Sequence, residues 1–129
     1  MRVKQFRDLK VWQKAMLLAR QTYTATADFP KQEMFGLTSQ MRRAAVSVPS
    51  NIAEGQGQLT DKGFILYLSR ARGSLYELET QAELAEGLGY LKRPNLDQKR
   101  PNLDQLLSEC GEVGRMLHGL VNSMREEQL

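Results

Sequence analysis

The sequence has one cysteine and one histidine among its 129 residues. A single thiol, at Cys110, excludes an internal disulfide and any zinc site built on cysteine pairs. With His118 as the other soft donor, the chain has too few ligands for a transition-metal site, and we expect neither metal nor cofactor. No run of about 18 apolar residues could span a bilayer, and the N-terminus shows no apolar signal core. We therefore expect a cytoplasmic protein with no membrane partner.

Residue pairs that support catalysis are missing as well. Cys110 and His118 are eight residues apart on one predicted helix, about 80° around its axis at 100° per residue. Glu77 and Glu79 point to different faces at a spacing of i, i+2. The segment Gly55-Gln56-Gly57 lacks the lysine and the preceding strand of a phosphate-binding loop, and it predicts a helix-ending turn. We expect no catalytic residue and no enzymatic activity.

Helical periodicity dominates the chain, which is 41% hydrophobic and 26% charged. No stretch shows the sustained alternation of a strand. The spacing of apolar residues predicts four helices, over about residues 8–28, 32–55, 61–88 and 101–126. Phe29-Pro30 ends the first, because a residue before proline avoids the α region. These helices predict a single all-α domain over residues 1–129, an antiparallel up-down-up-down four-helix bundle.

The predicted helices carry more apolar positions than one bundle seam requires. The surplus positions include Val11, Leu18, Leu107, Gly114 and Val121. A surplus apolar stripe is typical of a further interface, so we expect a homo-oligomer.

The stretch RRAAVSVPSNIAEG, residues 42–55, carries Pro49 inside a helical pattern. Val48 and Ile52 keep the apolar periodicity across the proline. This pattern predicts that the helix continues through Pro49 with a bend, and that nearby serine hydroxyls serve the backbone groups that the proline leaves without a partner.

The heptapeptide KRPNLDQ occurs at residues 92–98 and again, unchanged, at 99–105. A perfect copy in an otherwise non-repetitive chain is a local duplication, natural or engineered, and not a solenoid repeat. Pro101 would cost about 3 kcal/mol inside a helix but suits a first helical turn. We predict that the first copy lengthens the loop and that the second begins the last helix; a kinked last helix, extended by two turns, is the alternative.

The net charge of +3 is unevenly distributed. Residues 1–72 carry twelve Lys/Arg against five Asp/Glu, a balance of +7, whereas residues 73–129 carry six against ten, a balance of −4. A folded molecule with this split has a basic and an acidic region, which suit nucleic-acid binding, charged protein partners or head-to-tail self-association.

Four segments carry a family resemblance: FRDLKVWQKA at 6–15, FGLTSQMRRAAVSVPSNIAEG at 35–55, YLSRARGSLYELETQ at 67–81 and GEVGRMLHGL at 111–120. Together they resemble the 23S ribosomal RNA intervening-sequence proteins, also called the four helix bundle protein family. The resemblance implies a left-handed antiparallel bundle that assembles into a homopentameric ring, without catalytic activity. The chain is also similar to the accessory protein of diversity-generating retroelements, which partners a reverse transcriptase and nucleic acid. The KRPNLDQ duplication departs from the short link between helices three and four in this family.

The first candidate site is a set of arginines at the edges of the second and third predicted helices. They are Arg42, Arg43, Arg70 and Arg72. We predict that their guanidinium groups, repeated around an oligomer, form a basic surface that neutralises phosphates, with RNA as the favoured ligand. The alternative is that they form ion pairs with Glu54, Glu77 or Glu79, within or between subunits.

The second candidate site is a basic stripe on the first predicted helix, formed by Arg7, Lys10 and Lys14. A solvated polar face is the ordinary alternative. Trp12, Phe64 and Tyr67 fall on predicted core faces, so the sequence predicts no platform for base stacking. We therefore expect a non-enzymatic, oligomeric nucleic-acid-binding protein, with an oligomeric scaffold for a protein partner as the alternative.

Overall fold

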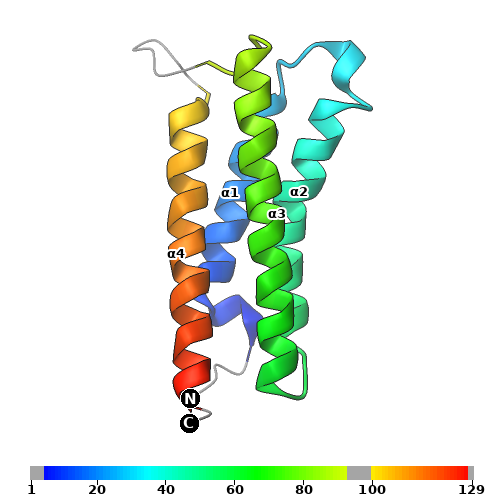
Figure 1. The fold of residues 1–129 in the computed structure, drawn as a ribbon. Helices are drawn as coiled ribbons and strands as arrows, with labels where there is room; N and C mark the ends of the chain where they lie inside the picture. The colour runs from blue at the N-terminus through cyan, green and yellow to red at the C-terminus, as the bar shows by residue number, and fades with distance from the viewer. Residues whose placement is uncertain (1–4, 93–99, 128–129) are drawn as a thin grey trace.

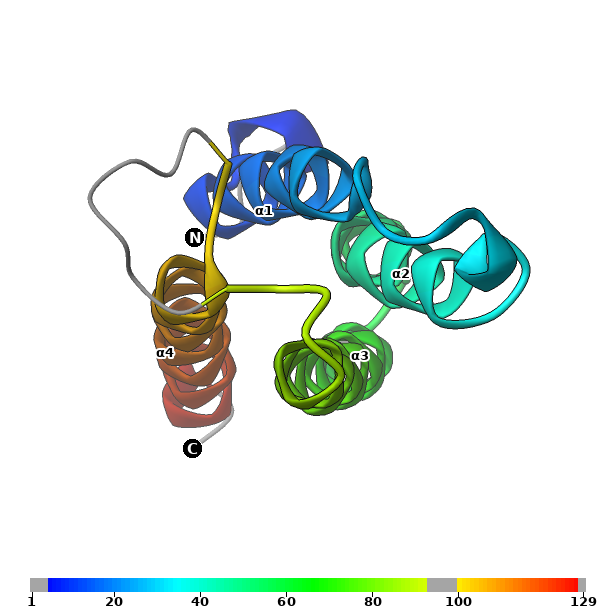
Figure 2. The same cartoon turned by 90° about the horizontal axis from the view of Figure 1, so that it is seen from above.

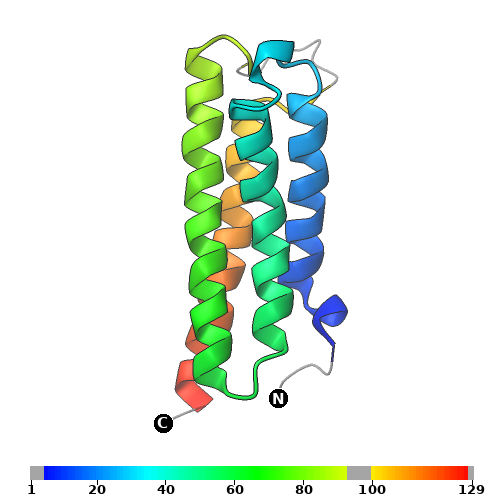
Figure 3. The same ribbon diagram turned by 90° about the vertical axis from the view of Figure 1, so that its right-hand side faces the viewer.

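A computed structural model describes residues 5–92 and 100–127 of the protein. These ranges hold four α-helices and no strand: α1 (Lys10–Thr26), α2 (Leu37–Gln56), α3 (Asp61–Gly87) and α4 (Leu103–Glu127). Two single turns of 3-10 helix, η1 (Phe6–Asp8) and η2 (Lys31–Glu33), precede α1 and α2. The helices alternate in direction along one long axis (Figures 1 and 3) and follow one another around the core (Figure 2). The predicted all-α four-helix bundle is confirmed.

One face of each helix forms the core, which includes Val11, Ala15, Leu18, Met41, Val48, Ile52, Phe64, Leu68, Leu75, Leu106, Val113 and Leu117. The structure corrects the prediction for the first helix, because its smaller residues fill the core while Trp12 and Met16 stay half-buried at the edge. Val11 and Leu18, which we counted as surplus, are buried within the single chain. Within the described ranges, every helix is too short or too polar to span a lipid bilayer.

The second helix begins five residues later than predicted, at Leu37 instead of about residue 32. Residues 34–36 form a turn after η2, and Gly36 has a non-helical backbone with φ −114° and ψ −116°. The Glu33 carboxylate accepts a hydrogen bond from the Leu37 backbone N–H at 3.2 Å, so it serves an unpaired donor of the first turn. The periodicity had concealed this break because Met34 and Leu37 continue an apolar helical spacing.

The helix α2 continues through Pro49, as the periodicity predicted. The predicted role of the serines is not seen, because no serine hydroxyl bonds to the backbone among the described residues of α2. The carbonyl that Pro49 leaves without its helical donor is that of Ala45, whereas the Asn51 side-chain amide donates to the Ser47 carbonyl at 2.8 Å. The Ser47 hydroxyl instead pairs with that of Ser74 on α3 at 2.8 Å. At the lower end of α2, Gly55 lies directly against α3, where an added Cβ would be 2.8 Å from Phe64 Cδ1.

The last helix begins in the second copy of the heptapeptide, at Leu103. Asn102 and Gln105 form a reciprocal cap: the Asn102 side chain accepts from the Gln105 N–H at 3.0 Å, and the Gln105 side chain accepts from the Asn102 N–H at 2.9 Å. Pro101 precedes the helix, so the kinked alternative, with Pro101 inside α4, is excluded. The first copy, apart from Lys92, lies outside the described residues.

Candidate nucleic-acid interface

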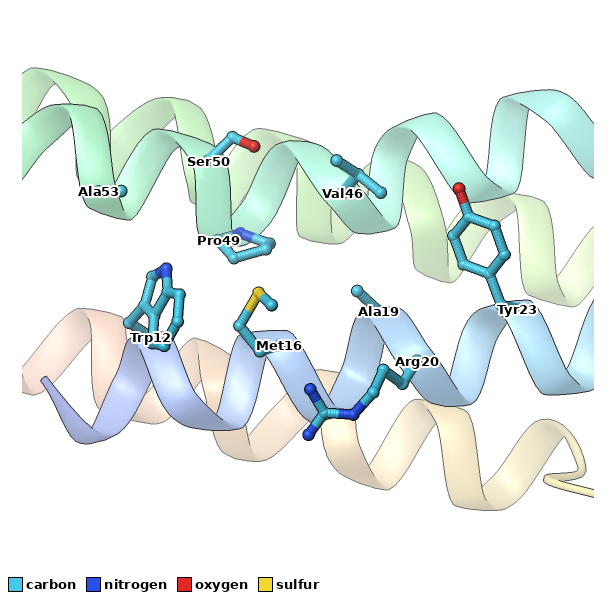
Figure 4. Close-up of a pocket in the computed structure, with 9 residues that line it drawn as sticks. All are labelled: Trp12, Met16, Ala19, Arg20, Tyr23, Val46, Pro49, Ser50 and Ala53. Atoms are coloured by element: carbon cyan, nitrogen blue, oxygen red, sulfur yellow. The ribbon is translucent and has the colours of Figure 1, made fainter. Parts of the chain in front are cut away.

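A groove runs along the outer side of the bundle between α1 and α2, in two parts that share Tyr23 and Val46. The part that we call the apolar end has a volume of about 460 Å³ and is lined by Trp12, Met16, Ala19, Arg20, Tyr23, Val46, Pro49, Ser50 and Ala53. Figure 4 shows Trp12, Met16 and Ala19 pointing from α1 toward Pro49 and Val46 of α2. The part that we call the basic end has a volume of about 480 Å³ and is lined by Tyr23, Met34, Thr38, Ser39, Arg42, Arg43, Val46 and Ser47.

The basic end holds Arg42 and Arg43, two of the predicted site residues. Arg42 reaches α1, where its Nε donates to the Thr26 hydroxyl at 2.9 Å and its guanidinium carbon lies 4.6 Å from the centre of the Tyr23 ring. Arg43 is exposed and forms no hydrogen bond, ion pair or ring contact within the described part of the chain. No aspartate or glutamate lines either part of the groove. Arg43 also lines a neighbouring hollow between α2 and α3 together with Glu77, without forming an ion pair with it.

One exposed aromatic ring, that of Tyr23, lines the basic end, and the exposed Phe35 follows the lining residue Met34 in the chain; the sequence reasoning had missed both. Tyr23 is 46% exposed under Arg42, and Phe35, next to the lining residue Met34, is 96% exposed. Phe35 was missed because residues 34–36 were predicted to be helical, although Gly36 after it was a signal of a turn. Tyr23 was missed because it lies on the same helical face as Trp12, which we had placed on a core face.

The predicted residue Arg7 lies beyond the apolar end of the groove. Its guanidinium carbon lies 4.5 Å from the centre of the Phe6 ring, and Phe6 packs edge-on against Trp12 with 5.3 Å between ring centres. Trp12 in turn lines the apolar end. Arg7 thus extends the positive charge of the groove past Trp12.

The other two residues of the predicted stripe are placed differently. Lys14 turns toward α4, where its Nζ lies 3.2 Å from a Glu112 carboxylate oxygen and 3.9 Å from one of Glu109. Lys10 is exposed at the first residue of α1. The structure therefore does not bring Arg7, Lys10 and Lys14 together on one open surface, since the charge of Lys14 is paired within the bundle.

Arg70 and Arg72 lie on α3, away from the groove. The Arg70 guanidinium carbon is 4.8 Å from the centre of the Tyr67 ring. Arg72 donates from Nε and Nη2 to the Tyr76 hydroxyl at 3.0 and 2.9 Å. Within residues 5–92 and 100–127, none of the four predicted arginines forms an ion pair with a carboxylate of the same chain. Three of them, Arg42, Arg70 and Arg72, instead contact tyrosine side chains, which do not neutralise the guanidinium charge.

Cys110 and His118 line one groove, between α3 and α4, but they do not form a nucleophile and base. Burial raises the pKa of the Cys110 thiol to about 12, and the nearby charges of Glu79 and Glu109 contribute in the same direction. His118 Nε2 lies 3.1 Å from the Asn122 side-chain amide. A thiol with this pKa stays protonated at neutral pH and is a weak nucleophile.

The fold and the groove define the protein as an all-α four-helix bundle with an arginine-lined groove on its outer side. The model of one family, 23S rRNA-intervening sequence protein, matches residues 7–119. The chain belongs to the 23S rRNA-intervening sequence protein family.

The fold is similar to that of a crystal structure from Bacteroides thetaiotaomicron, a protein with unknown function from the S23 ribosomal protein family. The TM-score is 0.72 at 21% sequence identity, over 86% of this chain and 97% of that chain. No curated protein matches this chain significantly. The comparisons thus establish the family and the fold.

Proposed function

We propose that the protein binds nucleic acid, with RNA preferred, as a non-enzymatic homo-oligomer, and that the basic end of the α1/α2 groove is the contact surface. The observation that carries this proposal is the composition of the basic end. Arg42 and Arg43 line it without any carboxylate, beside the exposed ring of Tyr23, and the exposed Phe35 follows the lining residue Met34 in the chain.

The two kinds of side chain at the basic end suit the two parts of a nucleotide. Guanidinium groups bind phosphate oxygens through two parallel hydrogen bonds, while exposed aromatic rings stack on bases that are not paired in a duplex. Sequence-specific RNA recognition mostly uses unpaired bases in loops and bulges. We therefore expect a preference for RNA with unpaired segments over duplex DNA. The family name, 23S rRNA-intervening sequence protein, directs the first test to ribosomal RNA.

In an oligomer, each subunit contributes one copy of the basic end. The apolar end of the groove exposes a hollow of about 460 Å³, which supports a further interface. The family resemblance implies a homopentamer. A closed ring would repeat the basic end once per subunit, and several weak phosphate contacts would then act together on one RNA.

The alternative function is a scaffold that binds a protein partner without contacting nucleic acid. The apolar end favours it, because its lining of Trp12, Met16 and Pro49 offers little to a phosphate. The two functions predict different responses to charge reversal at the basic end.

The test is an Arg43→Glu variant, measured for RNA binding over a salt series and for mass by light scattering. Arg43 forms no contact that the bundle needs, so its replacement leaves the fold intact. Arg125→Glu, on the last turn of α4, is the matched control with the same change in charge. We expect Arg43→Glu to weaken RNA binding and to reduce the salt slope by about 0.7 for each phosphate that the variant no longer binds, with the oligomer intact.

Two results would reject the proposal. If Arg43→Glu binds RNA as the control does, the basic end is not the contact surface. If the variant loses its oligomeric mass, Arg43 forms an ion pair between subunits, as in the scaffold alternative.

A further inference from the structure

The apolar end of the groove has no partner within the described part of the chain. Its lining is apolar except for Arg20 and Ser50, and Trp12 and Met16 remain half-buried there. In Figure 4 the side chains of α1 and α2 face one another across this hollow. Burying such a surface is favourable by about 25 cal/mol per Å² of apolar area.

The α3 helix and its C-cap residue carry three leucines that are exposed to solvent. Leu66 is 52% exposed, Leu84 54% and Leu88 51%. Leu66 and Leu84 are eighteen residues apart, which is five full turns, so they lie on one line along the helix. Among the described residues, no leucine on the outward faces of α1, α2 or α4 is exposed to this extent.

We infer that the apolar end of the groove receives Leu66 of a second copy of this chain, so that α3 of one subunit docks between α1 and α2 of the next. This inference rests on the proposed homo-oligomer and specifies which two surfaces form it. The following contacts select Leu66 from the three leucines.

Leu66 lies at the level of the apolar end along the bundle axis. Gly55 of α2 is in close contact with α3, where an added Cβ would lie 2.8 Å from Phe64 and 3.0 Å from Tyr67 Cβ. Leu66 is therefore level with Gly55, next to the lining residue Ala53. Leu84 lies five turns higher and Leu88, the C-cap residue of α3, about six turns higher, at the opposite end of the helix.

Leu66 and the apolar end of the groove lie at the same height along the bundle axis, and this common height bears on the symmetry of the assembly. Copies related by rotation about an axis parallel to the helices stay level with one another, so Leu66 of one copy meets Ala53 and Trp12 of its neighbour without a shift along the axis. The groove and the outward face of α3 are different surfaces, which makes the contact heterologous. A heterologous contact without a shift along the axis closes into a ring when the rotation between neighbouring copies divides a full turn.

Charges beside the two surfaces are complementary. Glu54 follows Ala53 on α2 and is exposed, and Arg70 lies one turn above Leu66 on α3 and is also exposed. Neither forms an ion pair within the described part of the chain. Docking of Leu66 brings Arg70 of one subunit to the side of the groove that carries Glu54 of the next.

The test uses two variants, each of which damages one surface. Ala53→Glu places a charge in the groove, and Leu66→Glu places one on α3. Leu88→Glu is the matched control, because it removes a leucine of equal exposure at the other end of α3. Circular dichroism confirms folding, and light scattering gives the mass. We expect the wild type and Leu88→Glu to be oligomers, and Ala53→Glu and Leu66→Glu to be folded monomers.

Mixing the two monomeric variants gives the sharper result. The intact groove of Leu66→Glu accepts Leu66 of Ala53→Glu, and no further copy can add, so the mixture forms a dimer of one chain of each. Variants that keep the wild-type mass overturn the inference while the proposed oligomer stands. A mixture that stays monomeric, or that rebuilds the full oligomer, overturns it as well. A monomeric wild type instead rejects the oligomer of the proposed function.

Discussion

Replacing Gly55 by alanine is expected to destabilise the protein, although alanine is the better helix former. The new Cβ would lie 2.8 Å from Phe64 Cδ1 and 3.0 Å from Tyr67 Cβ, where carbon atoms normally stand about 3.5–4.0 Å apart. Phe64 is fully buried, and the Cβ of Tyr67 moves only with the α3 backbone. Relief therefore requires α2 and α3 to separate. Overpacking of this kind costs about 1–3 kcal/mol, and the gain in helix propensity offsets at most about 1 kcal/mol.

Gly119→Ala is the matched control. Gly119 lies in α4, and an added Cβ there meets no atom within 4 Å. Only the propensity gain remains, so this variant is expected to be more stable than the wild type by about 0.5–1 kcal/mol. Urea unfolding at one fixed protein concentration, followed by circular dichroism, measures both variants. If Gly55→Ala is as stable as Gly119→Ala, the close approach of α2 and α3 at Gly55 is wrong.

Three further predictions concern the cap, the thiol and the exposed ring. Asn102→Ala removes a side chain that caps α4 and should lower the free energy of unfolding by about 1 kcal/mol, measured by urea titration; an unchanged midpoint would contradict the cap. Cys110 is 1% exposed, and its pKa is raised to about 12, so it should resist a thiol reagent at pH 8 in the folded protein and react fully in urea. Rapid labelling of the native state would argue against its burial. Phe35→Ala should weaken binding of single-stranded RNA by about 1–3 kcal/mol without changing the salt slope, because it removes stacking and no charge; a changed slope would show that the ring does not act by stacking alone.

The sequence predicts the helices well because their positions depend on local rules. Capping residues and proline geometry indicate where α3 and α4 begin, and apolar periodicity indicates that α2 continues through Pro49. The start of α2 was wrong, since Met34 and Leu37 keep a helical spacing across a turn that Gly36 and the Glu33 carboxylate define. The reciprocal cap of α4 was readable from the Asn-x-x-Gln spacing of its first turn.

The candidate site was harder to predict, because it depends on which helices are neighbours. Arg42 and Arg43 lie at the basic end as a pair, but their aromatic neighbour Tyr23 comes from α1, and only the packed bundle brings them together. The pairing of Lys14 with α4 is likewise a tertiary contact. Apolar periodicity also could not say which of two adjacent faces of α1 enters the core, and so it did not reveal the groove.

Salt dependence of RNA binding tests the central claim most directly. The purified wild-type protein is titrated with a labelled ribosomal RNA fragment that contains unpaired loops, and with duplex DNA of equal length, from low to high salt. Light scattering on the same sample gives its mass. The proposed function predicts an oligomer that favours the RNA and whose log affinity falls linearly with log salt. An oligomer that binds neither nucleic acid, even at low salt, would contradict it and would leave a protein partner as the ligand of the groove.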